Sequence, residues 1–126
     1  MSPSPSSVFP GVLSGDAIQK LGGATPVAIS ASGAIDPHTA NRYVITKATV
    51  AALTLAAPTA TADDGLEMDI YSNTAEAHTI TATGLFEDGA GNVNEATFAA
   101  HIGASIGLFA YQGKWFVKRL QNVTMS

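Results

Sequence analysis

Hydrophobic positions alternate with polar or small ones along most of the chain, which is the two-residue period of β-strands. The segment from Leu66 to Tyr71 alternates strictly, and the segment from His78 to Thr83 shows the same period. A five-residue loop over 72–76 would join them as a hairpin with Ile70 opposite His78, and this register would place every large apolar residue on one face. Shorter strands are expected near 27–31, 42–46, 53–55 and 95–98, with 124–126 as a closing edge.

The clearest hydrophobic pattern surrounds a two-residue turn, Gln112-Gly113, near the C-terminus. If Tyr111 pairs with Lys114, one face of the resulting hairpin carries Ile106, Leu108, Ala110, Trp115 and Val117. The other face carries Phe109, Tyr111 and Phe116. A half-buried strand should be polar on one side, whereas this ribbon is apolar on both. The second face is therefore expected to meet a second sheet or another subunit.

The first 24 residues do not share the β pattern. Prolines at positions 3, 5 and 10 disfavour a helix or a paired strand, so this part is either a disordered tail or an arm that becomes ordered on a partner. A short helix is expected after it, with Ser14 as its N-cap and Gly22-Gly23 at its end. Such a helix is too short to be stable alone and would have to dock on something.

About seven to nine short strands separated by turn residues predict an all-β fold, either a small antiparallel β-sandwich or a jelly-roll-like barrel. We divide the chain into an N-terminal arm with one short helix (1–24) and a β domain (25–126).

Composition narrows the functional classes. Of the 126 residues, 46% are hydrophobic and only 13% are charged, roughly half the usual charged share. Such a surface suits packing against protein. The net charge of −4 and the scattered Lys and Arg residues argue against nucleic acid as a partner. Cysteine is absent, which excludes disulfides and thiolate metal sites. The chain has no apolar stretch of the ~18 residues that a membrane span needs, and its first ten residues do not resemble a signal peptide.

Candidate chemistry is sparse. His38, His78 and His101 lack the spacing of a zinc site, and His78 is expected to be a satisfied or interface histidine. The segment from Glu87 to Glu95 resembles a calcium loop in composition but not in spacing, so a solvated loop is preferred. Asp63-Asp64-Gly65 is typical of a turn. No nucleophile or phosphate-binding motif is present, and we expect no enzymatic activity, no cofactor and no metal.

Two alternatives stay open at this point. A small hydrolase would use Asp63, Asp64 or Glu87. A carbohydrate site would use an aromatic platform, because aromatic rings stack on the apolar faces of sugars; its members would be Phe109, Tyr111, Trp115 and Phe116.

Several strand and turn motifs lie between positions 40 and 126: Tyr43-Val44-Ile45-Thr46, Leu53-Thr54-Leu55-Ala56-Ala57-Pro58, Asp63-Asp64-Gly65-Leu66, Ala77-His78-Thr79-Ile80-Thr81, Ala110-Tyr111-Gln112-Gly113-Lys114-Trp115-Phe116-Val117 and Asn122-Val123-Thr124. These motifs resemble small virion proteins of tailed bacteriophages, specifically head decoration (cement) and head-fibre proteins. The resemblance implies a β-rich homotrimer on the outer surface of the capsid, attached in many cases by an N-terminal segment. Residues 1–24 share no motif with this family.

We therefore expect a decoration protein that is made in the host cytoplasm and binds the major capsid protein. The expected capsid contacts are Val8, Phe9, Val12 and Ile18, and the expected trimer interface is Phe109, Tyr111 and Phe116. The main alternative is a tail-fibre or receptor-binding module that recognises carbohydrate on the host surface.

Overall fold

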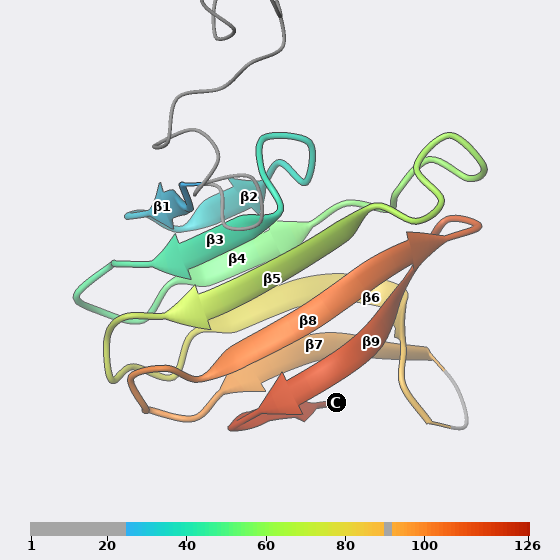
Figure 1. Cartoon of the computed structure of the whole chain (residues 1–126). Helices are drawn as coiled ribbons and strands as arrows, with labels where there is room; N and C mark the ends of the chain where they lie inside the picture. Colours follow the sequence, from blue (N-terminus) through green and yellow to red (C-terminus); the bar gives the residue numbers. More distant parts are fainter. Residues whose placement is uncertain (1–24, 90–91) are drawn as a thin grey trace, which may run out of the picture.

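The computed structural model describes residues 25–89 and 92–126. In this part of the chain all the regular elements are strands, and they form one curled, mixed sheet (Figure 1). The strands are β1 (Val27–Ile29), β2 (Gly33–Ile35), β3 (Arg42–Ile45), β4 (Ala52–Leu55), β5 (Glu67–Ser72), β6 (Thr79–Glu87), β7 (Asn92–Phe98), β8 (Ser105–Tyr111), β9 (Lys114–Gln121) and β10 (Val123–Met125).

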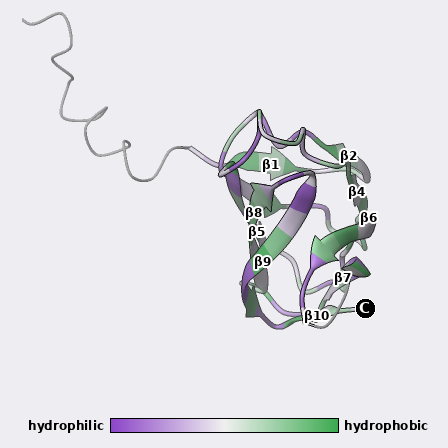
Figure 2. Ribbon diagram, turned by 90° about the vertical axis from the view of Figure 1, so that its right-hand side faces the viewer, coloured by the Kyte–Doolittle hydropathy of each residue, from purple (hydrophilic) through white to green (hydrophobic). Residues whose placement is uncertain are grey.

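The first six strands alternate between two parallel stacks. β1, β3 and β5 form one stack, and β2, β4 and β6 form the other. Each of these strands therefore lies in the opposite stack from the strand before it in the sequence. The β8–β9 hairpin joins the stacks, because β8 pairs antiparallel with β5 and β9 pairs parallel with β6. The sheet curls so that its two ends, β1 and β2, lie beside each other (Figures 1 and 2). β7 and then β10 extend the sheet from β6.

Alternation along the strands fills the space between the two stacks. In β5, Met68 and Ile70 are fully buried while Glu67 is exposed. The largest fully buried side chains come from both stacks, the hairpin and β7, and include Tyr43, Ile45, Leu53, Ile80, Phe86, Phe98, Ile106, Leu108 and Trp115. The indole nitrogen of Trp115 donates a hydrogen bond to the Ala56 carbonyl at 2.9 Å. Because this buried donor is satisfied, the ring fits the core without the penalty of an unpaired polar group.

The expected all-β class is confirmed, but the expected antiparallel sandwich or jelly roll is wrong in its pairing. The sheet is mixed, with parallel neighbours within each stack. The predicted hairpin of Ile70 with His78 is also wrong. Ile70 pairs with Tyr43 and Ile106, and β6 lies in the opposite stack. The alternation correctly identified the buried face of both strands. It could not identify the partner of β5, because pairing with β6 or with β3 and β8 buries the same face of β5.

The predicted arm and short helix fall on residues 1–24, which lie outside the described residues. Within 25–89 and 92–126 we find no helix that is long and apolar enough to cross a membrane.

His78 is buried and links two loops to the start of β6. The Ala51 N–H donates to its Nδ1 at 3.0 Å, which places the ring proton on Nε2, 2.8 Å from Thr74 Oγ1. The Thr74 hydroxyl in turn donates to the Lys47 carbonyl. Burial lowers the pKa of His78. The expected satisfied histidine is therefore confirmed, and it is held in its neutral form.

The burial of His78 predicts a loss of stability in mild acid. Because its pKa is lowered only in the folded protein, the unfolded chain binds the proton first as the pH falls below about 6.5. The free energy of unfolding should be at its full value above this pH and should decrease below it. His78→Gln keeps a donor and an acceptor but does not titrate, so urea unfolding of this variant should show a shallower decrease. Equal pH dependence in the two proteins would contradict this role.

Candidate interaction surface on the C-terminal hairpin

The turn between β8 and β9 has the geometry that the sequence predicts. Gln112 and Gly113 have φ values of 48° and 80°, as a two-residue turn of type I′ requires at both central positions. Tyr111 pairs with Lys114, Ala110 with Trp115 and Phe109 with Phe116. The register of the hairpin is therefore confirmed.

A carboxylate from a distant loop stabilises this turn. Asp64 Oδ1 accepts the Gln112 N–H at 2.8 Å, and Asp64 Oδ2 accepts from the Gln112 side-chain amide at 2.6 Å. The neighbouring Gly65 N–H donates to the Ala110 carbonyl at 2.7 Å. Glutamine rarely adopts a positive φ, and these bonds compensate for that strain. The Asp63-Asp64-Gly65 segment is thus a turn that also fixes the hairpin.

The two faces of the hairpin have different environments. Ile106, Leu108, Ala110 and Trp115 are buried in the core. On the outer face, the Phe109 and Phe116 rings stack with their centroids 5.2 Å apart, and Tyr111 meets Phe116 edge to face at 6.0 Å. Phe109 and Phe116 are half-buried, and Tyr111 is 53% exposed. We call these three residues the aromatic cluster.

Within the described residues, no second sheet lies over the aromatic cluster. All ten strands belong to the one curled sheet, and its interior is filled by the opposite face of the hairpin. Of the two expected covers for this face, a second sheet and another subunit, the first is absent from this part of the chain. Stacked and edge-to-face rings that stay partly exposed are typical of protein contact sites.

A network of charged side chains lies beside the aromatic cluster on the same outer face. Lys118 Nζ donates to Glu67 at 2.7 Å, and Arg119 Nη2 donates to Asp69 at 3.0 Å. The Arg119 guanidinium also bonds Ser105 Oγ and lies 5.4 Å from the centre of the Tyr71 ring. The network therefore ties β5, β8 and β9 together across their outer surface.

Gly107 provides the space for this network. A Cβ at this position would come within 2.8 Å of Asp69 Oδ1 and 3.1 Å of Lys118 Cε. A bulge between Gly107 and Leu108 lets the consecutive residues Lys118 and Arg119 both reach this face. The sequence analysis did not identify this network. Its one signal was the adjacent pair Lys118-Arg119, which breaks the alternation of a regular strand.

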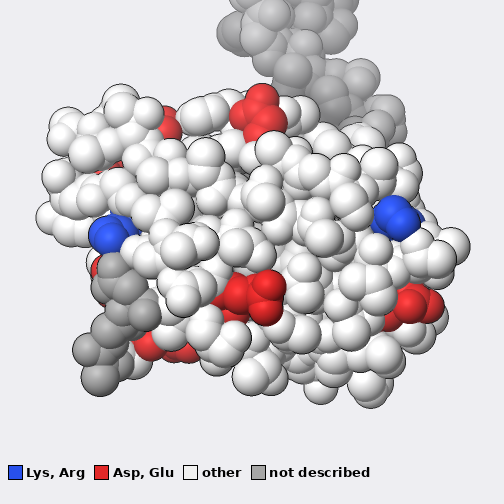
Figure 3. Space-filling view, turned by 180° about the vertical axis from the view of Figure 1, so that it is seen from behind, with Lys and Arg blue, Asp and Glu red and all other residues white. Residues whose placement is uncertain are grey.

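The outer face of the other stack is uncharged over most of its area (Figure 3). Threonines face outward on four neighbouring strands and pair across them: Thr54 with Thr81, Thr79 with Thr97, and Thr97 with Thr124. Glu95 accepts hydrogen bonds from Thr81 and Thr97. The two outer faces thus offer different chemistry, aromatic and charged on one side and hydroxyl-rich on the other.

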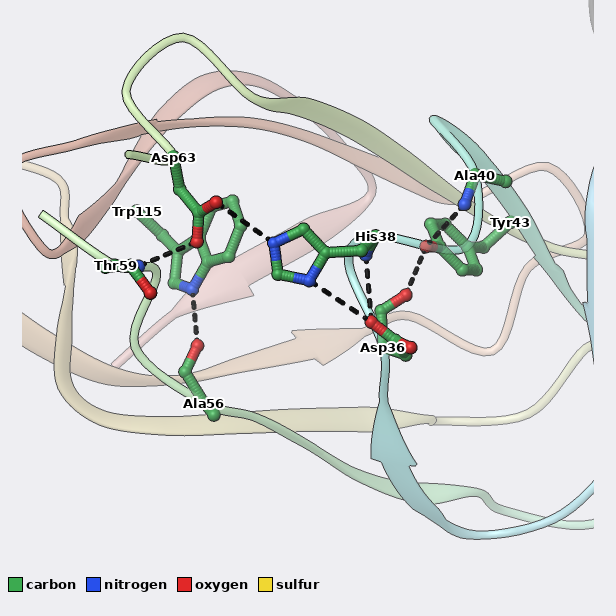
Figure 4. A network of polar contacts seen from close by, with 8 residues as sticks. All are labelled: Asp36, His38, Ala40, Tyr43, Ala56, Thr59, Asp63 and Trp115. Atoms are coloured by element: carbon green, nitrogen blue, oxygen red, sulfur yellow. Dashed lines mark hydrogen bonds and ion pairs between the residues drawn. The ribbon is translucent and has the colours of Figure 1, made fainter. Parts of the chain in front are cut away.

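His38 links two loops at the protein surface (Figure 4). Its Nε2 lies 3.0 Å from Asp63 Oδ1, and its backbone N–H donates to Asp36 Oδ1 at 2.9 Å. The hydrogen bond with Asp63 raises the pKa of His38. Asp63 Oδ2 also accepts the Thr59 N–H, and this bond lowers the pKa of Asp63. The exposed His38 and the largely covered Asp63 carboxylate thus hold these surface loops together, and the Asp36 carboxylate does the same within its own loop.

The remaining candidates are separated in space or engaged elsewhere. Among the described residues, no three His, Asp or Glu side chains come together as a possible metal site. The segment from Glu87 to Glu95, which the sequence predicts to be a solvated loop, is strand at both ends, because β6 ends at Glu87 and β7 begins at Asn92. Asn94 accepts the Gly84 N–H and Glu95 accepts from threonines, so both act as strand residues of β7. The alternative of a sugar platform loses one of its four members, because Trp115 is fully buried. Val8, Phe9, Val12 and Ile18 lie outside the described residues.

The chain matches no known protein family, and no curated protein or solved structure is significantly similar to it.

Asp64 provides a test of the hairpin turn. Asp64→Ala removes the acceptors for the Gln112 N–H and the Gln112 side chain, and should lower the free energy of unfolding by about 1 kcal/mol. Asp64→Asn keeps one acceptor oxygen and should lose less. Urea unfolding gives the stability, and hydrogen exchange at Gln112 reports the turn itself. An unchanged exchange rate at Gln112 in Asp64→Ala would show that the contact does not hold the turn.

Proposed function

We propose that this protein is a non-enzymatic structural component of a bacteriophage virion. In this proposal it assembles as a homotrimer through the aromatic cluster and decorates the outer surface of the assembled head. The observation that carries the proposal is the aromatic cluster itself: two stacked rings and a third exposed ring on a sheet face that no described strand covers. The similarity of the strand and turn motifs to phage decoration proteins supplies the class of assembly.

The composition of the surface supports a role in assembly. A typical protein interface has a core of aromatic residues and a polar rim. Phe109, Tyr111 and Phe116 supply such a core, and the ion pairs of Lys118 and Arg119 lie next to it as a rim. The hydroxyl-rich face of the other stack adds a surface with few charges to desolvate. Both faces are suited to contact with protein.

In the proposed mechanism, many individually weak contacts with the capsid add up to a stabilised particle. A decoration protein stabilises the particle by mass action, because it binds the assembled capsid and not the free subunits. A trimer presents each contact three times, so contacts that are weak on one chain sum to firm attachment. The contacts with the major capsid protein expected from the sequence are Val8, Phe9, Val12 and Ile18, all of which precede the β domain. We assign the first three to the capsid and Ile18, the nearest of the four to the β domain, to packing on this chain's own strands.

A second candidate is a tail-fibre or receptor-binding module that recognises host carbohydrate. The exposed ring of Tyr111 favours it, because a free aromatic face can stack on a sugar. Glycan binding by the isolated protein that Tyr111→Ala abolishes, with the fold retained, would support this function in place of capsid decoration.

Tyr111→Asp tests the aromatic cluster as the trimer interface. A charge at this exposed position should leave the subunit folded and should prevent burial of the cluster between subunits. Light scattering should give about three times 12.8 kDa for the unmodified protein and a single subunit mass for the variant. Ile102→Asp adds the same charge at a 65% exposed apolar residue away from the cluster and should remain a trimer. A monomeric unmodified protein, or a trimeric Tyr111→Asp, would contradict the assignment.

Deletion of residues 1–13 tests the capsid contacts. The truncated protein should retain the circular dichroism and the trimeric state of the full chain, because the deleted residues precede all ten strands. It should no longer sediment with assembled capsids, whereas the full chain should. Full co-sedimentation of the truncated protein would place the capsid contacts elsewhere.

A further inference from the structure

The curled sheet has an open end between β1 and β2. These strands are the first and last in the strand order, and the outer edge of each pairs with no described strand. Each is three residues long, and they lie beside each other at one end of the molecule (Figure 1). Two unpaired edges side by side leave backbone groups and apolar side chains without a neighbour. Stacked folds of this kind usually need a cap at such an end.

A hollow of about 280 Å³ lies at this end. Val27, Ile29, Ile35 and Tyr43 give its lining a mainly apolar character, and Ser30, Asp36 and Thr39 add polar groups. Val27 and Ile29 are only half-buried, although they point into the same core that buries Tyr43 and Ile45 completely. An apolar cavity of about 150 Å³ holds one benzene ring, so this hollow has room for about two aliphatic side chains.

The length of the preceding chain limits what can reach the hollow from the same molecule. Leu21 is six residues before Val27, a lining residue, and so lies within about 22 Å of it even in a fully extended chain. Ile18 lies three residues further back. Between positions 17 and 26 these two are the large apolar residues, and the others are Ala17, Gln19, Lys20, Gly22, Gly23, Ala24, Thr25 and Pro26.

We propose that Ile18 and Leu21 of the same chain fill this hollow and cap the open end of the sheet. A tether this short gives the two side chains a high effective concentration at the mouth, so they occupy it ahead of a separate partner. Gly22-Gly23 lets the chain turn back over β1. Ile18 then packs on its own domain and is not a capsid contact, while Val8, Phe9 and Val12 remain free to bind the capsid. The cap does not depend on the proposed function.

Matched substitutions in the full chain test the cap. Ile18→Asp and Leu21→Asp should each lower Tm by about 5 °C, because a carboxylate there would lose water against Val27, Ile29 and Ile35 and would be repelled by the Asp36 carboxylate. They should also speed hydrogen exchange in Val27–Ile29 and Gly33–Ile35. Gln19→Asp adds the same charge between the two positions and should change neither measurement. If Ile18→Asp and Leu21→Asp behave like Gln19→Asp, the proposal is wrong.

Cross-linking gives a second readout that does not depend on a destabilised variant. The chain has no cysteine of its own, so Leu21→Cys combined with Ala34→Cys introduces a single pair. Mild oxidation should link these positions within one chain. Ser4→Cys combined with Ala34→Cys is the control and should not link. A link found only between chains would assign the hollow to a neighbouring copy and overturn the same-chain cap, and the absence of any link would also overturn it. Deletion of residues 1–13 leaves the cap intact, so failure of capsid binding and failure of the cap are separate results.

Discussion

The fold depends on the β8–β9 hairpin, which joins two stacks of strands that are otherwise unconnected by backbone pairing. Within the described residues, the stack of β1, β3 and β5 shares no ladder with the stack of β2, β4 and β6. β8 completes the first stack and β9 meets the second, so the turn at Gln112-Gly113 sets how the sheet curls. This explains why the turn is supported from outside the hairpin, by the carboxylate of Asp64. The β8–β9 ladder is thus the backbone connection between the two walls of the core.

The same hairpin separates the requirements of folding from those of the proposed assembly. Its inner face supplies Trp115 and Leu108 to the core, where the indole N–H finds the Ala56 carbonyl. Its outer face has no role in the core, and it carries the aromatic cluster beside a charged network. A substitution at Tyr111 therefore changes an outer contact, while a substitution at Trp115 changes the fold. Proposed assembly through the outer face is compatible with a stable subunit because the two faces share only backbone.

The open end between β1 and β2 and the aromatic cluster are both surfaces that no described strand covers, but they differ in their position relative to the rest of the chain. The hollow at the open end lies next to Val27, where the undescribed first 24 residues join the sheet, and this position favours an occupant from the same chain. The aromatic cluster is carried by the C-terminal hairpin, which pairs with neither β1 nor β2. We therefore assign a cap to the first and a neighbouring subunit to the second.

Local pattern in the sequence determined most of the strands, their buried faces and the hairpin register, but it missed β2 (Gly33–Ile35). Alternation identified Met68, Ile70 and Ile80 as core, and a turn of two residues with positive φ allowed only one pairing of Tyr111 with Lys114. The parallel neighbours of β3 and β5 came from the tertiary structure alone, because a strand's burial pattern is the same whichever strand lies beside it. The charged network around Gly107 was also visible only in the tertiary structure. A β-bulge and a contact between Asp69 and Arg119, which are fifty positions apart, leave almost no local signal in the sequence. Short-range sterics and the period of the strand act within a few residues, whereas the choice of neighbour is made by the whole core.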